Sequence, residues 1–345
     1  MDNSKELQAT IAQMSARGKG LLAADESVAT ITKRLQAVGV ESTIDTRRAY
    51  RDLLLSAHNI NDYLSGVILF EETLNQTALD GTPFAKLLQD RHIVPGIKVD
   101  KGLVAWSLQN PESVTQGLDG LSERLQKYKT QGARFAKWRA VYMVSDNTPS
   151  KAVNSFNAIC LARYAQICQD NGMVPIVEPE ILIDGAHTLE QCEKTSEKVL
   201  STVFKALRKY GVILEYIILK PSMVIAGKKC PQQSTVAEVA VATMRVLKRT
   251  VPAAVPSINF LSGGQTPLQA TQHLQAMNAM GNLPWHLSFS YARALQEPCM
   301  EKWRGKSENK KAAQTVLLHR AKLNQLATLG QYQSQLENEL NAYHE

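Results

Sequence analysis

Short, mostly apolar runs rich in branched side chains recur along the whole chain and predict strands. They cover residues 20–24, 66–70, 96–99, 134–139, 174–177, 214–219, 257–261 and 285–290. Most are too uniformly apolar for a strand with one face in water, in which apolar and polar residues alternate, so we expect both faces of these strands to be buried. The run 134–139 fits least well because it carries three charged side chains.

The segments between these runs have the 3.6-residue periodicity of amphipathic helices. The clearest helical segments are 151–171, 190–210, 236–248 and 307–329. Strands alternating with helices predict βαβ units, and eight strands close the parallel barrel of the α/β class known as the (β/α)8 or TIM barrel. We find neither an internal repeat nor a domain boundary. Residues 1–345 are therefore expected to form a single domain with a flexible polar tail at about 331–345.

The length and the net charge of the chain agree with such a barrel and limit the classes of ligand that it is expected to bind. The chain has 345 residues, of which 44% are hydrophobic, and its net charge is +7, from 39 lysines and arginines against 32 acidic residues. No compact basic stripe with interleaved aromatic side chains is present, so nucleic-acid binding is not expected. We expect the excess charge to gather in one cleft and attract a small anionic substrate.

The sequence favours a cytoplasmic protein. Residues 1–14 contain no apolar segment of the kind found in signal peptides, and no apolar run reaches the ~18 residues that cross a membrane. The five cysteines are odd in number and include no C-x-x-C pair. This cysteine pattern indicates buried, inert thiols in a reduced compartment. Because no apolar run is long enough to span a bilayer, we expect no membrane partner.

Charged side chains gather where the predicted strands end. In chain order they are Asp25, Lys98, Asp100, Lys137, Arg139, Glu178, Glu180, Lys220 and Arg293. Active sites of this barrel lie at the carboxyl ends of the strands. Residues i and i+2 share one face of a strand. Lys137 and Arg139 can therefore both face the interior, and so can Glu178 and Glu180. For Arg139 and Glu180, a salt bridge that merely fills the barrel is an equal alternative.

A lysine in such a cluster has a specific chemistry. Burial and neighbouring positive charge both favour a neutral amine, which can attack a carbonyl and form a Schiff base. A neighbouring carboxylate can supply the acid and base that this reaction needs. The residues alone leave the choice open among Lys98, Lys137 and Lys220. Lys220 is favoured because it directly follows the apolar run 217–219.

Two places suit a phosphate group. Ser262-Gly263-Gly264 is a small turn beyond the seventh strand, close to Arg293 beyond the eighth, and these loops form the usual phosphate site of the fold. Ser27 and Thr30 lie at the expected start of a helix, where anions bind. An ordinary turn and an ordinary helix cap are the alternatives.

Metal and nucleotide chemistry find no support in the sequence. The seven histidines include no pair at i, i+2 or i, i+4, and none joins a compact cysteine or aspartate cluster. No G-x-G-x-x-G follows a strand, and no Walker loop is present. We therefore expect no metal and no cofactor.

Nine segments together resemble class I fructose-bisphosphate aldolases. They are 20–27 (GLLAADES), 66–74 (GVILFEETL), 96–102 (GIKVDKG), 116–121 (QGLDGL), 135–139 (FAKWR), 174–180 (VPIVEPE), 219–221 (LKP), 260–265 (FLSGGQ) and 289–295 (FSYARAL). The resemblance runs in order through nearly the whole chain. It implies metal-independent, reversible cleavage of fructose 1,6-bisphosphate to dihydroxyacetone phosphate and glyceraldehyde 3-phosphate, in glycolysis and gluconeogenesis. It also implies a cytosolic homotetramer.

The resemblance assigns roles to individual residues. Lys220 would form the Schiff base, and Glu178 would be its acid and base. Lys137 and Glu180 would position the surrounding charges, while Asp25 would handle the proton of a substrate hydroxyl. One phosphate would be held by Ser262, Gly263, Ser290 and Arg293. The other would lie near Ser27, Thr30 and Lys98, with Arg34 and Arg139 close by.

The chain departs from the family pattern at three places. Thr30 replaces a usual serine and keeps the hydroxyl. Ala292 replaces a usual glycine, and a positive φ at this position would be strained. The family commonly ends in a tyrosine that reaches the active site, for which Tyr343 is the best candidate here and Tyr332 a weaker one.

Two other functions compete with this interpretation. Another Schiff-base barrel, such as a transaldolase-like enzyme or a dehydratase, would need only one phosphate site. A barrel that only binds or scaffolds would show no cleavage at all.

Overall fold

The computed structural model describes residues 3–343, with side chains from residue 3 to residue 339. Its strands are β1 (Gly20–Ala24), β2 (Leu64–Leu69), β3 (Val94–Lys98), β6 (Phe135–Tyr142), β7 (Val174–Ile181), β8 (Ile218–Leu219), β9 (Ser257–Phe260) and β10 (His286–Tyr291). They pair in parallel and close in the order β1-β10-β9-β8-β7-β6-β3-β2. The predicted single-domain (β/α)8 barrel is confirmed.

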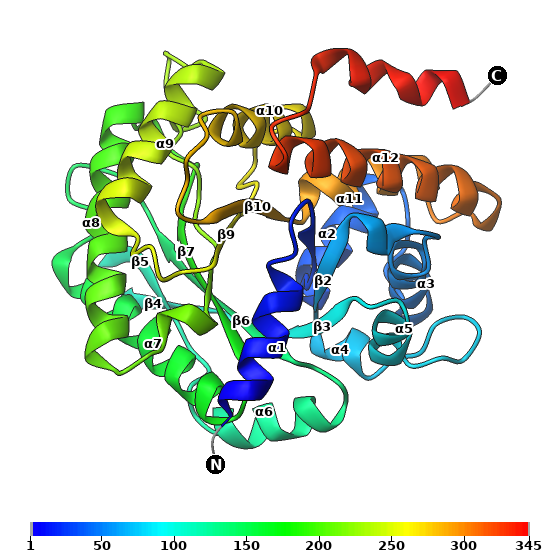
Figure 1. The fold of residues 1–345 in the computed structure, drawn as a ribbon, viewed down its shortest axis with the longest axis horizontal. Helices are drawn as coiled ribbons and strands as arrows, with labels where there is room; N and C mark the ends of the chain where they lie inside the picture. The colour runs from blue at the N-terminus through cyan, green and yellow to red at the C-terminus, as the bar shows by residue number, and fades with distance from the viewer. Residues whose placement is uncertain (1–2, 344–345) are drawn as a thin grey trace.

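Helices surround the barrel on its outside (Figure 1). They are α2 (Val28–Ala37), α3 (Ile44–Leu55), α4 (Glu71–Leu74), α5 (Phe84–Asp90), α6 (Leu121–Thr130), α7 (Lys151–Asp170), α8 (Leu189–Lys209), α9 (Val236–Thr250), α10 (Pro267–Asn278), α11 (Arg293–Trp303) and α12 (Lys310–Thr328). Thr188, Thr235 and Thr266 begin α8, α9 and α10 with capping boxes, in which the threonine hydroxyl accepts from the third backbone N–H of the helix. The four predicted helices are confirmed, except that residues 307–309 form a 3-10 turn ahead of α12.

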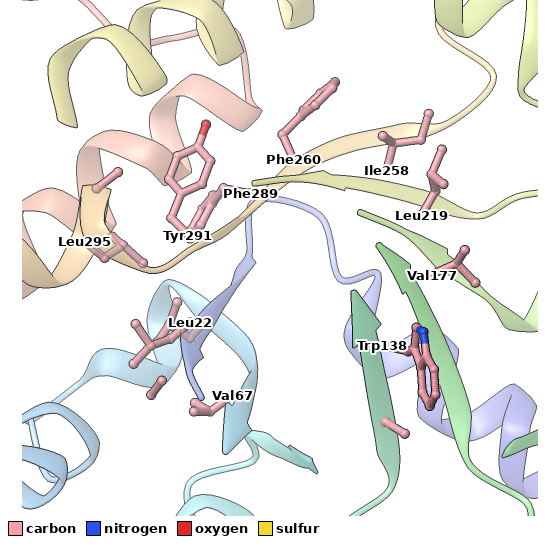
Figure 2. Packing of buried hydrophobic residues seen from close by; sticks show 14 of the residues in the cluster. Leu22, Val67, Trp138, Val177, Leu219, Ile258, Phe260, Phe289, Tyr291 and Leu295 are labelled. Carbon is pink, nitrogen blue, oxygen red and sulfur yellow. The ribbon is translucent and has the colours of Figure 1, made fainter. Parts of the chain in front are cut away.

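The outward side chains of the strands pack against these helices. Figure 2 shows part of this layer, with Leu22, Trp138 and Val177 on three different strands. Trp138 on β6 lies against Tyr164 on α7, with 5.5 Å between the ring centroids. Burial of these rings and aliphatic groups supplies most of the driving force that holds the helices on the barrel.

The inward side chains form a separate apolar cluster at the amino end of the barrel. Leu7, Ile11 and Met14 of α1 (Ser4–Met14) pack there against inward residues such as Phe135 and Ile218. Figure 1 shows α1 lying across the strands, so this helix covers one mouth of the barrel. The opposite mouth is left for the charged side chains.

Two details of the strand predictions are wrong. Residues 214–219 are not one strand, because Leu214–Tyr216 is a 3-10 turn and only Ile218–Leu219 joins the sheet. An antiparallel hairpin outside the barrel, made of β4 (Leu103–Ser107) and β5 (Asn110–Thr115), was not predicted. Every residue of β4 is exposed, so the hairpin lacks the continuous burial that marks the barrel strands.

Part of the expected tail is ordered into a 3-10 helix, η4 (Ser334–Tyr343). Tyr332 is buried ahead of it and donates a hydrogen bond to Glu337, which also pairs with Arg320 of α12. The predicted flexibility of the tail stays a prediction. The five cysteines are free and buried, as expected. The described residues contain no helix with the length and apolar character needed to cross a bilayer.

Candidate active site

A cavity of about 590 Å³ opens at the carboxyl ends of the barrel strands. Of the predicted site residues whose side chains are described, only Tyr332, the weaker tyrosine candidate, does not line it. The lining residues are Asp25, Ser27, Thr30, Arg34, Lys98, Lys137, Arg139, Glu178, Glu180, Lys220, Ser262, Gly263, Ser290 and Arg293. The side chain of Tyr343 lies outside the described residues. The sequence-based grouping of charged and hydroxyl side chains into one interior is therefore confirmed.

Strand pairing fixes the heights of the central charges. Lys98 on β3 is level with Lys137 on β6, and Arg139 is level with Glu178 on β7. Lys220 directly follows β8, and its backbone N–H donates to Val177 O at 2.8 Å. Backbone hydrogen bonds of the barrel thus hold these residues on rigid elements.

Four buried side chains form a continuous chain of charge. Lys137 Nζ lies 2.7 Å from Asp25 Oδ2 and 3.1 Å from Glu178 Oε2. The other carboxylate oxygen of Glu178, Oε1, lies 3.0 Å from Lys220 Nζ. Because two cations alternate with two anions, each buried charge has an opposite neighbour, as burial requires.

The protonation states follow from burial and this pairing. Burial alone would raise the pKa of Asp25, but the Lys137 and Lys220 ammonium groups outweigh it and hold that pKa well below its usual range. The same two lysines lower the pKa of Glu178 against burial. Burial would lower the pKa of Lys137, yet Asp25 and Glu178 raise it above its ordinary value. Lys137 is therefore a permanent cation between two carboxylates.

These contacts separate the three lysines that the sequence left open. Lys137 is shared between two carboxylates, and Lys98 Nζ donates to both Oδ1 and the backbone oxygen of Asp100, at 2.6 and 2.9 Å. Lys220 contacts one carboxylate oxygen, which can accept its proton. Lys220 is thus the amine best placed to become a nucleophile.

Two arginines on the cavity wall are held by carboxylates. Arg139 Nε donates to Glu180 Oε2, so the salt bridge considered from the sequence exists, and both residues also line the cavity. Arg34 donates to Glu26, which is buried and also pairs with Arg51 at 2.8 Å. Sequence reasoning missed the role of Glu26 in orienting Arg34, although its place in the Asp25-Glu26-Ser27 motif was visible.

The turn beyond β9 places two glycines in the left-handed backbone region. Gly263 and Gly264 have φ of +49° and +83°, values that favour glycine. Gln265 holds the turn through Nε2, which donates to Ser262 O at 3.0 Å, and His273 Nδ1 lies 2.5 Å from Gln265 Oε1. Burial lowers the pKa of His273 to about 4, so the imidazole is neutral near pH 7. No sequence signal indicated this Gln265–His273 pair.

The neighbouring strand β10 completes this corner of the cavity. Ser290 Oγ is buried there and has no hydrogen-bond partner among the described residues, which makes it available to a ligand. Ala292 has φ of −100°, an ordinary value for alanine. The strain considered for a positive φ at Ala292 therefore does not arise.

The second expected phosphate position lies at the start of α2. Ser27 Oγ accepts from the Thr30 backbone N–H at 3.4 Å, so Ser27 is the ordinary helix cap considered as the alternative. Both hydroxyl groups nevertheless line the cavity, together with Arg34 and Lys98.

Metal ligands are not grouped in the described part of the chain. Among residues 3–343, no three histidine, cysteine, aspartate or glutamate side chains come together in an arrangement that could hold a metal ion.

Comparisons with known proteins agree across the whole chain. The sequence model of the family "Fructose-bisphosphate aldolase class-I" matches residues 6–344. A probable fructose-bisphosphate aldolase class 1 of Xanthomonas campestris pv. campestris is 51% identical and covers 95% of this chain and 98% of its own length. The fructose-bisphosphate aldolase of Dictyostelium discoideum is 52% identical, over 96% and 94%. A solved structure of the Plasmodium falciparum aldolase, in complex with TRAP and a small-molecule inhibitor, superposes with a TM-score of 0.95 at 50% identity and 96% coverage of both chains.

Proposed function

The chain belongs to the class I fructose-bisphosphate aldolase family, and we propose that it cleaves fructose 1,6-bisphosphate through a Schiff base on Lys220. The products are dihydroxyacetone phosphate and glyceraldehyde 3-phosphate, and the reaction is reversible, in glycolysis and gluconeogenesis. The observation that carries the mechanism is the contact of Lys220 Nζ with one oxygen of Glu178, whose other oxygen faces the Lys137 ammonium.

Schiff-base formation uses Lys220 and Glu178. Glu178 Oε1 takes a proton from the Lys220 ammonium, and the free amine adds to the C2 carbonyl of the open-chain ketose to give a carbinolamine. Protonated Glu178 then gives its proton to the carbinolamine hydroxyl, which leaves as water. The result is an iminium ion that takes the positive charge formerly carried by the Lys220 ammonium.

Carbon–carbon cleavage uses Asp25. Its lowered pKa keeps the carboxylate ionised, so it can accept the proton of the C4 hydroxyl. As the C4 aldehyde forms, the C3–C4 bond breaks and its electron pair flows into the iminium ion to give an enamine. Protonation of C3 and hydrolysis of the new iminium ion release dihydroxyacetone phosphate and regenerate Lys220.

The remaining cavity residues bind and orient the substrate. Lys137 provides fixed positive charge beside Asp25 and Glu178, and Glu180 orients Arg139. One phosphate is held by Ser262, Gly263, Ser290 and Arg293. The other phosphate is held by Ser27, Thr30, Arg34, Lys98 and Arg139. Two such phosphate positions would favour a bisphosphate lyase over a transaldolase-like enzyme or a dehydratase.

Three further properties belong to this proposal. Catalysis needs no metal, because Lys220 supplies the electron sink that a metal would otherwise provide. The protein forms a homotetramer in the cytoplasm. Exposed apolar side chains on β4 and α7, where the tilted rings of Trp106 and Phe156 lie with their centroids 5.5 Å apart, offer a surface suited to self-association. Tyr343 assists proton transfer to the enamine.

Borohydride trapping with fructose 1,6-bisphosphate, in the presence and absence of EDTA, tests the mechanism. We expect a substrate-sized adduct that peptide mass mapping assigns to Lys220, unaffected by EDTA. Lys137, another buried lysine in the same cavity, is the internal control and should carry no adduct. An adduct on another lysine, no adduct, or activity abolished by EDTA would overturn the proposal.

A further inference from the structure

Two cations meet beside the glycine turn of the cavity. A Cβ atom built on Gly264 would lie 2.9 Å from Lys228 Nζ and 3.3 Å from Arg293 Nη2. The two nitrogens are therefore no farther apart than the sum of these distances. Lys228 lies in an exposed loop, nine residues after the last residue of β8.

These two cations differ from the other charged groups of the site. Lys98, Lys137, Arg34, Arg139 and Lys220 each pair with a carboxylate. Arg293 and Lys228, in contrast, form no side-chain hydrogen bond or ion pair with any described residue. Two like charges held close together without a counter-charge repel each other, and an anion between them removes that cost.

The backbone holds Lys228 at this position. The N–H groups of Gly227, Lys228 and Lys229 donate to His187 O, Ile183 O and Gly185 O, at 2.8, 2.9 and 2.8 Å. These bonds tie the loop after β8 to the loop after β7. The Lys228 side chain is therefore directed by an anchored segment rather than by a free loop.

We propose that Lys228 is a second cation for the phosphate group bound at Ser262, Gly263 and Arg293, and thereby raises the affinity for a dianionic phosphate ester. This assignment rests on the proposed function. A phosphate ester carries close to two negative charges at pH 7 and has three acceptor oxygens, so one group can serve both cations and the backbone N–H groups of the turn. Gly264 keeps the space between the two cations open because it has no side chain.

The test compares Lys228→Met with Lys229→Met. Lys229 is the next residue, equally charged and exposed, so its replacement controls for the loss of net charge. For Lys228→Met we expect roughly a five- to tenfold rise in the Kd of dihydroxyacetone phosphate, measured from the concentration dependence of borohydride trapping. The Ki of inorganic phosphate as a competitive inhibitor should rise by a similar factor.

Lys228→Arg should restore most of the affinity, since it keeps the charge. The KM for fructose 1,6-bisphosphate should rise more than kcat falls in Lys228→Met, and its dependence on salt should weaken. Affinities unchanged in Lys228→Met, or changed equally in Lys229→Met, would overturn the assignment.

Failure of this assignment is distinguishable from failure of the proposed function. If the wild-type protein gave neither cleavage nor trapping, the proposed function would be lost. Binding of inorganic phosphate, followed by 31P NMR titration, would still test Lys228 against Lys229 in that case.

Discussion

The two mouths of the barrel are built from the same strands but hold opposite kinds of side chain. On β7 the inward positions begin with Val174 and Ile176 and continue with Glu178 and Glu180. On β8 the inward Ile218 is followed by Lys220. We call the mouth closed by α1 the apolar end and the mouth with the cavity the charged end.

The difference shows how the fold supports its chemistry. At the apolar end, Phe135 packs closely with the side chains of α1, and this close packing fixes the positions of the strands relative to one another. At the charged end, the buried ions add little net stability because their desolvation offsets their attraction. The apolar end and the outer helix layer therefore stabilise the molecule, and the charged end can be arranged for reaction.

The largest effect is expected when the nucleophile of the charged end is removed. Lys220→Met should lower the cleavage rate by about 10⁴-fold or more, as removal of a covalent nucleophile does. Its thermal unfolding should change little, because Glu178 keeps Lys137 as a partner. Cleavage assays and circular dichroism melting measure the two quantities.

The matched control is Lys137→Met, a change of the same kind in the same chain of charge. It leaves Asp25 and Glu178 facing each other without the cation between them, which should cost about 3–5 kcal/mol of unfolding free energy. The informative result is that Lys137→Met lowers the unfolding free energy whereas Lys220→Met does not. Full activity in Lys220→Met would refute the assigned nucleophile.

At the apolar end, a single added methyl group should destabilise the protein. A Cβ on Gly96 would lie 2.1 Å from a ring carbon of Phe135. Overpacking of this kind typically costs about 1–3 kcal/mol, and we expect Gly96→Ala to lie near 3 kcal/mol in urea unfolding. Activity per folded molecule should stay close to that of the wild type.

A second substitution shows whether the clash is the cause. Phe135→Leu frees space beside residue 96, so the double variant should be less destabilised than the sum of the two single variants. Simple additivity would mean that the 96–135 contact does not limit packing at the apolar end.

Acid should weaken the charged end through a buried histidine beside the phosphate turn. His273 has a pKa of about 4 in the fold against an ordinary 6.5, so the unfolded chain binds a proton that the folded protein excludes as the pH falls from 6.5 to 4. Stability should drop by about 2 kcal/mol across that window. His273→Asn should flatten this part of the profile in urea unfolding at several pH values.

The carboxylates contribute in a separate, more acidic window. The lowered pKa values of Asp25 and Glu178 contribute stability above the unfolded pKa of about 4 and lose it as the pH falls further. A loss between pH 6.5 and 4 that persisted unchanged in His273→Asn would show that another group is responsible.

The contrast between the two ends also explains what the sequence could predict. Along β6 and β7 the residues change from apolar to charged within a single strand. The barrel and its cavity residues could therefore be predicted from the sequence of each strand alone. Other contacts join segments that are distant in the sequence. Leu7 and Ile11 close the apolar end of the barrel, and His273 contacts Gln265, which holds the phosphate turn. Such contacts depend on how the closed barrel brings helices together, and periodicity within one segment does not encode them.

The smallest effect is expected when the C-terminal residues are deleted, which tests whether the charged end needs Tyr343 in addition to the groups of the barrel. The described tail is fixed to α12 by Arg320–Glu337 and by the buried Tyr332, so a deletion of residues 341–345 should leave folding and these anchors intact. We expect turnover to slow roughly tenfold, about 1.4 kcal/mol in activation free energy, because proton transfer to the enamine loses its assistance. Borohydride trapping on Lys220 should be unchanged, since Schiff-base formation uses Glu178. Tyr343→Phe is the matched substitution, and it should reproduce the slower turnover if the phenol is the active group. Unchanged turnover in both variants would mean that the barrel supplies every group that the charged end requires.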